Sequence, residues 1–108
     1  MSQSATGVPA VLAVLADETR WNILTEIGSQ DLSASALAHR LPISRQAIAK
    51  HLAVLSDAGL VESVSVGREI RYRALGARLS ALATELENIG REWDRRLAAI
   101  KRIAERSD

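Results

Sequence analysis

The fold of this chain is decided by one stretch, which reads Ser44-Arg-Gln-Ala-Ile-Ala-Lys-His-Leu-Ala-Val-Leu-Ser-Asp-Ala-Gly59. Serine is a residue type that caps helix N-termini, and glycine is the commonest residue just past a helix C-terminus. Between these two ends Ile48, Leu52 and Leu55 recur at helical spacing. The stretch therefore predicts an amphipathic helix that buries one stripe of aliphatic side chains.

The outer face of this helix is basic, polar and small in its first half. Next to the N-cap Ser44 it carries Arg45, Gln46, Ala49 and Lys50. Arginine and glutamine can make bidentate contacts with base edges, and a small alanine lets a helix approach them closely. We therefore predict that these five residues contact double-stranded DNA.

A second, shorter helix is expected just before it. Ser33 can cap this helix, which continues to Arg40. Pro42 stops it, because the residue before a proline disfavours helical geometry. Only residues 41–44 then separate the two helices, and a connection of this length is typical of a helix-turn-helix.

Alternating segments on both sides of Gly67 predict a hairpin after the second helix. The expected strands are residues 60–66 and 70–75. Arg68 would lie at the tip, and Arg71 and Arg73 would share one face of the second strand. We predict that Arg68 contacts a phosphate or the minor groove and that Arg71 and Arg73 contact the DNA backbone. Phosphate contacts of this kind position a protein on the duplex without reading its sequence.

A helix-turn-helix followed by a basic hairpin is the pattern of a winged helix-turn-helix. In such a unit one helix enters the DNA major groove, and the strand loop lies on the neighbouring backbone. We expect a mainly α fold (α+β by strict count) with a two-stranded wing, forming a DNA-binding domain over residues 8–75. Residues 1–7 are expected to be a disordered tail.

Two further helices are expected in the N-terminal part of this domain. A proline fits the first turn of a helix that carries Leu12 and Leu15. Asp17 fits the N-cap of the next helix, residues 18–28, and lies three residues before Arg20, with which it is expected to form a local pair. Trp21 on that helix is expected to pack.

The longest predicted element is a C-terminal helix over residues 76–106. Its apolar side chains recur three or four residues apart: Leu79, Leu82, Leu86, Ile89, Trp93, Leu97, Ile100 and Ile103. This seam is about 37 Å long at 1.5 Å per residue, more than a small winged domain can cover. We expect the same helix of a second subunit to cover it, together with Leu12 and Leu15. A helix folded back on its own domain is the alternative.

The composition of the 108 residues narrows the class of protein. The net charge is only +1, but it is unevenly distributed: residues 1–30 carry more acids than bases, whereas residues 44–75, where the predicted DNA contacts lie, carry five arginines and lysines against three acids. Without cysteine there is no disulfide and no thiolate metal site. No apolar run approaches the roughly 20 residues of a membrane span, and no signal peptide is recognisable, so we expect a cytoplasmic protein. No catalytic constellation or cofactor motif is present, so an enzyme is not expected.

Taken together, these stretches resemble the ArsR/SmtB family of dimeric bacterial repressors. The resemblance covers about residues 10–75. It is carried by Leu15-Ala-Asp-Glu-Thr-Arg20, Ile23-Leu24, Leu37-Ala38, Leu41, Ser44-x-x-x-Ile48-Ala-x-His51-Leu52-x-x-Leu55-x-x-Ala58-Gly59-Leu60-Val61, Gly67-Arg68 and Tyr72-Arg-Ala-Leu75. The resemblance implies a homodimer joined through its first and last helices, a fourth helix that reads DNA, and repression relieved by an inducer.

The chain departs from the metal-sensing members of that family. Those members carry cysteines at the start of the helix before the reader, or acidic and histidine ligands on the last helix. Here residues 31–38 contain no cysteine and the last helix contains no histidine, so transition metals lack their preferred ligands. His39 is expected at a helix end and His51 in packing, and neither is expected to bind a metal.

The leading interpretation is a dimeric, sequence-specific repressor that binds an inverted-repeat duplex and is not controlled by metal. Its effector, if it has one, would be an unknown small molecule or protein. The alternative is a winged-helix dimer that acts as a protein-interaction module. Such a module does not need arginines at the wing tip, and a steep salt dependence of DNA binding would separate the two interpretations.

Overall fold

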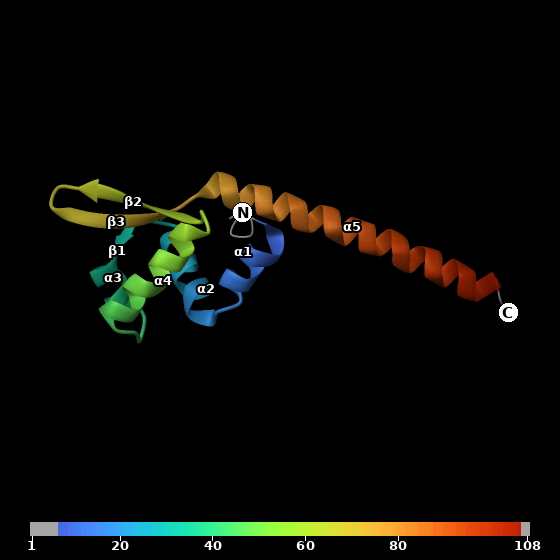
Figure 1. Ribbon diagram of the computed structural model, residues 1–108, viewed down its shortest axis with the longest axis horizontal. Helices are drawn as coiled ribbons and strands as arrows, with labels where there is room; N and C mark the ends of the chain where they lie inside the picture. The colour runs from blue at the N-terminus through green and yellow to red at the C-terminus, as the bar shows by residue number, and fades with distance from the viewer. Residues whose placement is uncertain (1–6, 107–108) are drawn as a thin grey trace. The chain divides into compact units, whose positions relative to one another are not determined.

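The computed structural model describes residues 7–106. Over this range the elements are α1 (Val8–Leu15), α2 (Glu18–Ile27), β1 (Leu32–Ser33), α3 (Ala34–Arg40), α4 (Arg45–Asp57), β2 (Val61–Val66), β3 (Glu69–Ala74) and α5 (Gly76–Arg106) (Figure 1). The chain divides into two compact units between Arg78 and Leu79. The expected winged helix-turn-helix is confirmed in the first unit. The predicted disordered tail, residues 1–7, lies outside the described residues except for Gly7, which is the N-cap of α1.

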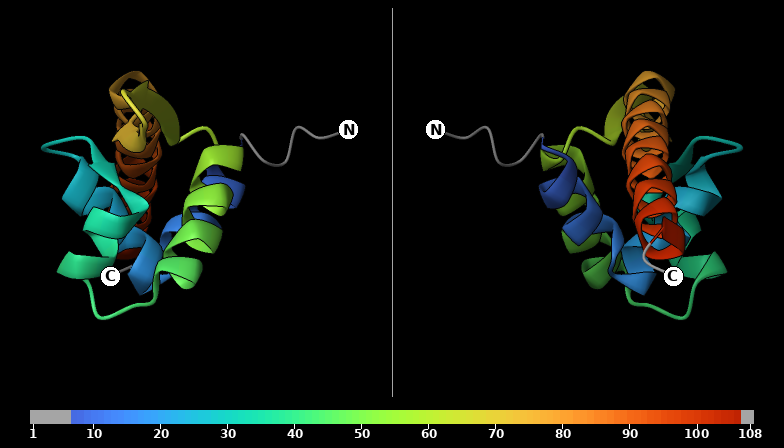
Figure 2. Two further views of the ribbon diagram at one scale, coloured as in Figure 1. Left: turned by 90° about the vertical axis from the view of Figure 1, so that its left-hand side faces the viewer. Right: turned by 90° about the vertical axis from the view of Figure 1, so that its right-hand side faces the viewer.

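Three helix N-termini are capped by the side chains that the sequence predicts. Ser44 Oγ accepts a hydrogen bond from the Ala47 amide at 3.1 Å, and Ser33 Oγ accepts one from Ala36 at 3.1 Å. Asp17 Oδ1 accepts a hydrogen bond from the Arg20 amide at 3.0 Å. Each cap satisfies a backbone donor that the first turn of a helix leaves without a partner. The caps thus set where α2, α3 and α4 begin, and Figure 2 shows the short loop that this leaves between α3 and α4.

The sheet contains one strand more than the expected two-stranded wing. β2 and β3 form an antiparallel hairpin in which Ser63 pairs with Tyr72 and Val64 with Arg71. The short strand β1 adds to the other edge of β3, with Leu32 opposite Tyr72, so the strand order is β1-β3-β2. A two-residue strand is too short to show an alternating pattern, and for that reason the sequence did not reveal it.

The core of the first unit is aliphatic. Its side chains with less than 2 % of their surface exposed are Ile23, Leu37, Ile48, Leu52, Leu55, Leu60 and Val61. The predicted stripe of α4 supplies three of them, and α4 packs against α2, α3 and β2. No polar or charged residue is buried in the part of the chain that the structure describes. We call α4, the helix predicted to read DNA, the reader helix. Its position depends on aliphatic packing along one face.

Trp21 does not pack as expected. The stripe that α2 buries consists of Ile23, Leu24 and Ile27, whereas Trp21 is 54 % exposed. At about 100° per residue, Trp21 lies roughly 100° or more from the middle of this stripe. The prediction was wrong because the helix buries a narrow face, and the indole lies outside it.

The C-terminus of α4 is closed by a left-handed glycine. Gly59 has φ +77°, its amide donates to the carbonyl of Ser56, and the Leu60 amide donates back to the carbonyl of Leu55. This pair of hydrogen bonds is the Schellman motif. Next to it, the Arg78 guanidinium donates to the carbonyl of Ala58 at 3.4 Å. The motif turns the chain directly from the reader helix into β2.

We predict that Gly59→Ala lowers the free energy of unfolding by about 1–2 kcal/mol, because a β-carbon is strained in the left-handed conformation. An added β-carbon would also meet the Arg78 guanidinium at 3.3 Å. The measurement is urea unfolding followed by circular dichroism. Gly76→Ala is the matched control, since a β-carbon there meets nothing within 4 Å and should change stability by less than about 0.5 kcal/mol. Equal stability of Gly59→Ala and the wild type would contradict this account of the turn.

Candidate nucleic-acid interface

The N-terminal half of α4 presents the side chains that the sequence predicts as DNA contacts. Ser44, Arg45, Gln46, Ala49 and Lys50 are all exposed. The opposite face of the helix is the buried stripe of the core. Because the helix is anchored along one side only, its first two turns are free to enter a groove. No acidic residue lies in its first turn, so nothing there repels a polyanion.

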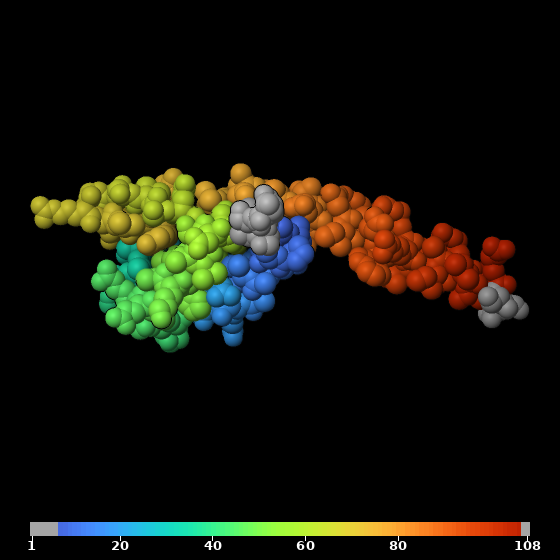
Figure 3. Space-filling model, in the orientation of Figure 1, coloured from blue at the N-terminus to red at the C-terminus, as the bar shows by residue number. Residues whose placement is uncertain are grey.

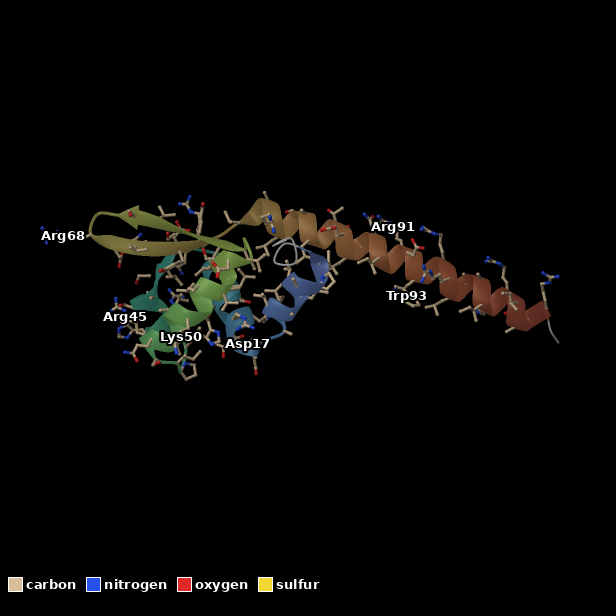
Figure 4. All side chains as sticks on the ribbon, in the orientation of Figure 1. Asp17, Arg45, Lys50, Arg68, Arg91 and Trp93 are labelled. Carbon is tan, nitrogen blue, oxygen red and sulfur yellow. The ribbon has the colours of Figure 1, made fainter. Side chains whose placement is uncertain are left out.

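Arg45, Lys50 and Arg68 are cations without a partner in the described part of the chain. None of the three forms a hydrogen bond or an ion pair with any of residues 7–106. Arg45 and Lys50 project from α4, and Arg68 extends from the tip of the hairpin, beside the left-handed Gly67 (φ +64°) (Figure 4). The hairpin projects past the helices of the first unit (Figure 3). These cations are therefore available to anionic groups at two separate places on the same surface.

The two other wing arginines are held by carboxylates. Arg71 Nε donates to Glu69 Oε1 at 2.7 Å. Arg73 Nη2 donates to Asp31 Oδ2 at 2.9 Å, and Glu62 lies 3.9 Å away across the hairpin. The hydrogen bond to Asp31 and the charge of that carboxylate raise the pKa of Arg73. Direct DNA contact by Arg71 or Arg73 stays a prediction, and it would require a phosphate to displace a carboxylate from each guanidinium.

Sequence reasoning missed the carboxylates that bind these arginines. Asp31 lies 42 residues before Arg73, and only the pairing of β1 with β3 brings the two together. No local signal in the sequence could reveal this contact. Glu69, by contrast, lies two residues before Arg71 on the same strand face. The period of two could have indicated that pair.

Asp17, Arg20 and His51 form a polar cluster between the start of α2 and the reader helix. Arg20 Nε donates to the carbonyl of Val14 at 2.7 Å, and its Nη1 lies 3.5 Å from His51 Nδ1 on α4. The same guanidinium lies 3.9 Å from the Asp17 carboxylate, so the predicted local pair is confirmed. The hydrogen bond from the Arg20 amide lowers the pKa of Asp17, and the charges of Arg20 and His51 lower it further. Arg20 thereby connects the end of α1, the start of α2 and the reader helix.

The predicted dimer residues of α5 are apolar and largely exposed. From Leu86 onward the seam is 38–63 % exposed at Leu86, Ile89, Trp93, Leu97, Ile100 and Ile103. Leu82 is buried and Leu79 is half-buried. On α1, Leu12 is 41 % exposed and Leu15 is half-buried. The guanidinium of Arg96 lies over the Trp93 ring, 5.4 Å from its centre.

Within residues 7–106 the side chains that could ligate a metal do not gather. No three histidine, cysteine, aspartate or glutamate side chains of this range form a group that could hold an ion. Over the same range, no helix is both long and apolar enough to cross a bilayer.

The comparisons with known proteins agree with this geometry. The helix-turn-helix domain family matches residues 15–64. The solved structure of an ArsR-like transcriptional regulator from Rhodococcus sp. RHA1 superposes with a TM-score of 0.81 at 70 % identity, covering 90 % of this chain and 92 % of that one. The HTH-type transcriptional regulator Rv2034 of Mycobacterium tuberculosis is 36 % identical over 89 residues, which are 82 % of this chain and 80 % of that protein.

The chain belongs to the ArsR/SmtB family.

This ArsR/SmtB protein is therefore a transcriptional regulator with a DNA-binding helix-turn-helix, and the resemblance seen in the sequence is confirmed. The transcriptional activator HlyU of Vibrio cholerae is similar at a greater distance. It is 27 % identical over 89 residues, which are 82 % of each chain.

We predict that Asp17→Ala destabilises the protein near neutral pH and that the gap to the wild type narrows in acid. A carboxylate whose pKa is lowered by folding stabilises the native state above its unfolded-state pKa. That stabilisation is lost as pH falls through the lower, folded-state value. The measurement is thermal unfolding at a series of pH values from about 7 to about 2. Glu87→Ala, which removes an exposed acid with no ion pair to residues 7–106, is the control and should show no such trend. A gap that stayed constant with pH would contradict the ionic part of this cap.

Proposed function

We propose that this ArsR/SmtB protein is a homodimeric repressor that binds an inverted-repeat DNA duplex. Each α4 enters a major groove, and each wing lies on the neighbouring backbone. The observation that carries the proposal is the set of three cations without partners, Arg45, Lys50 and Arg68, on the reader helix and the wing tip. Ser44, Gln46 and Ala49 complete the proposed contact surface on α4.

The exposed seam of α5 supports the dimer. Its apolar side chains from Leu86 to Ile103 are 38–63 % exposed in a single chain, over a helix that runs from Gly76 to Arg106. Monomeric soluble proteins rarely leave a contiguous apolar surface of this kind open to water. We propose that the second copy covers Leu79, Leu82, Leu86, Ile89, Trp93, Leu97 and Ile100, together with Leu12 and Leu15 of α1.

The chemistry of the chain supports control by something other than a transition metal. The sequence has no cysteine, and its two histidines lie outside α5. We propose that the effector, where one acts, is a small molecule or another protein, and that the protein works in the cytoplasm. Repression requires only that the dimer occupy a promoter, whereas activation requires a further contact with the transcription machinery. The activator HlyU is a relative by sequence, so a promoter-reporter assay has to decide the direction of control.

The proposed function is tested by selecting binding sites from random duplexes and footprinting the result. We expect an inverted repeat whose half-sites lie about one helical turn apart, about 10–11 base pairs, protected on both halves. Protection of one isolated half-site by a monomer would contradict the proposal. Binding that does not weaken steeply with salt would favour a protein-interaction module instead.

We predict that Arg68→Ala weakens binding to all DNA sequences alike and lowers the salt slope by about one unit per subunit, because it removes a phosphate contact. Gln46→Ala should instead relax base preference at one position of each half-site, because it removes a base contact. The measurement is fluorescence anisotropy with specific and random duplexes over a salt series. If Arg68→Ala left the non-specific affinity and its salt slope unchanged, the proposal that the wing contacts the DNA backbone would be wrong.

We predict that Trp93→Ala dissociates the dimer at micromolar concentration. Truncating a buried tryptophan costs about 3–5 kcal/mol, and in a symmetric dimer the substitution is made twice. Sedimentation velocity reads the result. Trp21→Ala is the matched control, since this second exposed tryptophan lies on α2, outside the proposed interface, and its variant should remain dimeric. A Trp93→Ala protein that stayed dimeric and bound its operator normally would overturn the interface.

A further inference from the structure

A groove lies between the start of α3, the start of α4 and the wing. Its volume is about 570 Å³. The lining side chains that offer hydrogen-bond donors, positive charge or an apolar surface are Ser33, Ser35, Arg45, Arg68, Ile70 and Tyr72. All of them belong to the first unit, and none except Arg45 and Arg68 has been given a role in DNA binding above. The groove therefore connects the reader helix to the wing tip through residues that no DNA-contact prediction includes.

The groove is rich in hydrogen-bond donors that have no acceptor. The hydroxyl groups of Ser35 and Tyr72 form no hydrogen bond with any of residues 7–106. Ser33 Oγ accepts from the Ala36 amide, which leaves its own proton available. Arg45 and Arg68 add guanidinium donors without partners. A ligand for such a surface must supply several acceptor oxygens.

The charge of the groove favours an anion. Arg45 and Arg68 carry positive charge, and the one carboxylate among the lining side chains is that of Glu69. Its Oε1 already accepts from Arg71 Nε at 2.7 Å. Arg71 therefore holds and neutralises the one acid among the described lining residues that would repel a bound phosphate. This gives Arg71 a positioning role without a direct contact to the ligand.

The shape of the groove favours a sugar-phosphate strand over a free ion. One wall is formed by Ile70, which is 54 % exposed on the wing, and by the ring of Tyr72. An apolar wall next to hydroxyl donors suits the alternation of deoxyribose and phosphate along a DNA strand. The groove also lies between α4, which is proposed to enter the major groove, and the wing, which is proposed to lie on the neighbouring backbone. In B-DNA a phosphodiester strand forms the boundary between the major groove and the adjoining minor groove.

We propose that this groove holds the phosphodiester strand that separates the two grooves of the operator, and that the Ser35 and Tyr72 hydroxyls donate to one phosphate of that strand. The inference depends on the DNA binding proposed above. It adds two residues, Ser35 and Tyr72, to the proposed DNA contacts. It also gives Arg71 a different role, which is to neutralise the Glu69 carboxylate instead of contacting DNA.

The first test combines protein variants with neutral methylphosphonates placed at single positions of the selected operator. In the wild type, neutralising one particular phosphate per half-site should weaken binding about tenfold, as the loss of a charge-assisted hydrogen bond does. The Ser35→Ala/Tyr72→Phe protein should bind the unmodified operator about tenfold more weakly and should lose its sensitivity at that phosphate alone. Tyr72→Phe by itself keeps the ring and is the second variant, should the double substitution disturb folding.

Ser65→Ala is the matched control, because Ser65 lies on the same face of the hairpin but does not line the groove. It should bind as the wild type does. Two results would overturn the groove assignment while leaving the proposed function intact. One is wild-type affinity of the double variant. The other is a double variant that remains as sensitive as the wild type to a methylphosphonate at every position, so that the losses of affinity from protein and DNA changes are independent. A wild-type protein without salt-dependent DNA binding would instead overturn the proposed function itself.

The second test separates the positioning role of Arg71 from a direct contact. Arg71→Gln should weaken operator binding, because it frees the Glu69 carboxylate next to the phosphate. Adding Glu69→Gln should restore the affinity, since no acid then remains to be neutralised. If the Arg71→Gln/Glu69→Gln protein bound as weakly as Arg71→Gln alone, Arg71 would be a direct phosphate contact and the positioning role would be wrong.

Discussion

The turn at Gly59 is the constraint on which the DNA-binding unit depends. Its left-handed conformation lets the Leu60 amide close the end of α4, so only three residues separate the end of the reader helix from the start of the wing. The residues that follow, Leu60 and Val61, are almost fully buried. The Leu75 amide donates to the Leu60 carbonyl, which ties the end of the hairpin to the same point. The reader helix and the wing thus share one anchor, and the groove lies between them.

The distribution of paired and unpaired arginines explains how a chain of net charge +1 can present a DNA-binding surface. Arg20, Arg71 and Arg73 are bound by carboxylates or a backbone carbonyl and stabilise the fold. Arg45 and Arg68 have no such partner within residues 7–106. An arginine already bound to a carboxylate gains less from a phosphate than a free one does, because it must give up an existing charge-assisted hydrogen bond. In the first unit the functional signal is therefore which cations are free, a property that counting residues does not give.

Much of the fold follows from local features that can be recognised in the sequence, namely helix caps and the spacing of apolar residues. The caps at Asp17, Ser33 and Ser44 are each formed by the predicted side chain, and the aliphatic stripe of α4 is buried as its spacing indicates. These features depend on residues within one or two helical turns. What the sequence did not reveal depends on distant segments: strand β1 and the bond between Asp31 and Arg73 exist only once β1 pairs with β3. Of the candidate site, the free side chains of α4 and the wing tip could be predicted, whereas the groove between them could not.

The most direct test of the central claim is a titration of the isotope-labelled protein with its selected inverted-repeat duplex, followed by backbone amide chemical shifts. The account predicts that the large shifts fall on three segments of the first unit: residues 33–35, 44–50 and 67–72. Together these segments surround the groove and carry the free cations. Large shifts confined to α1, α2 or α5, with these three segments unchanged, would contradict it.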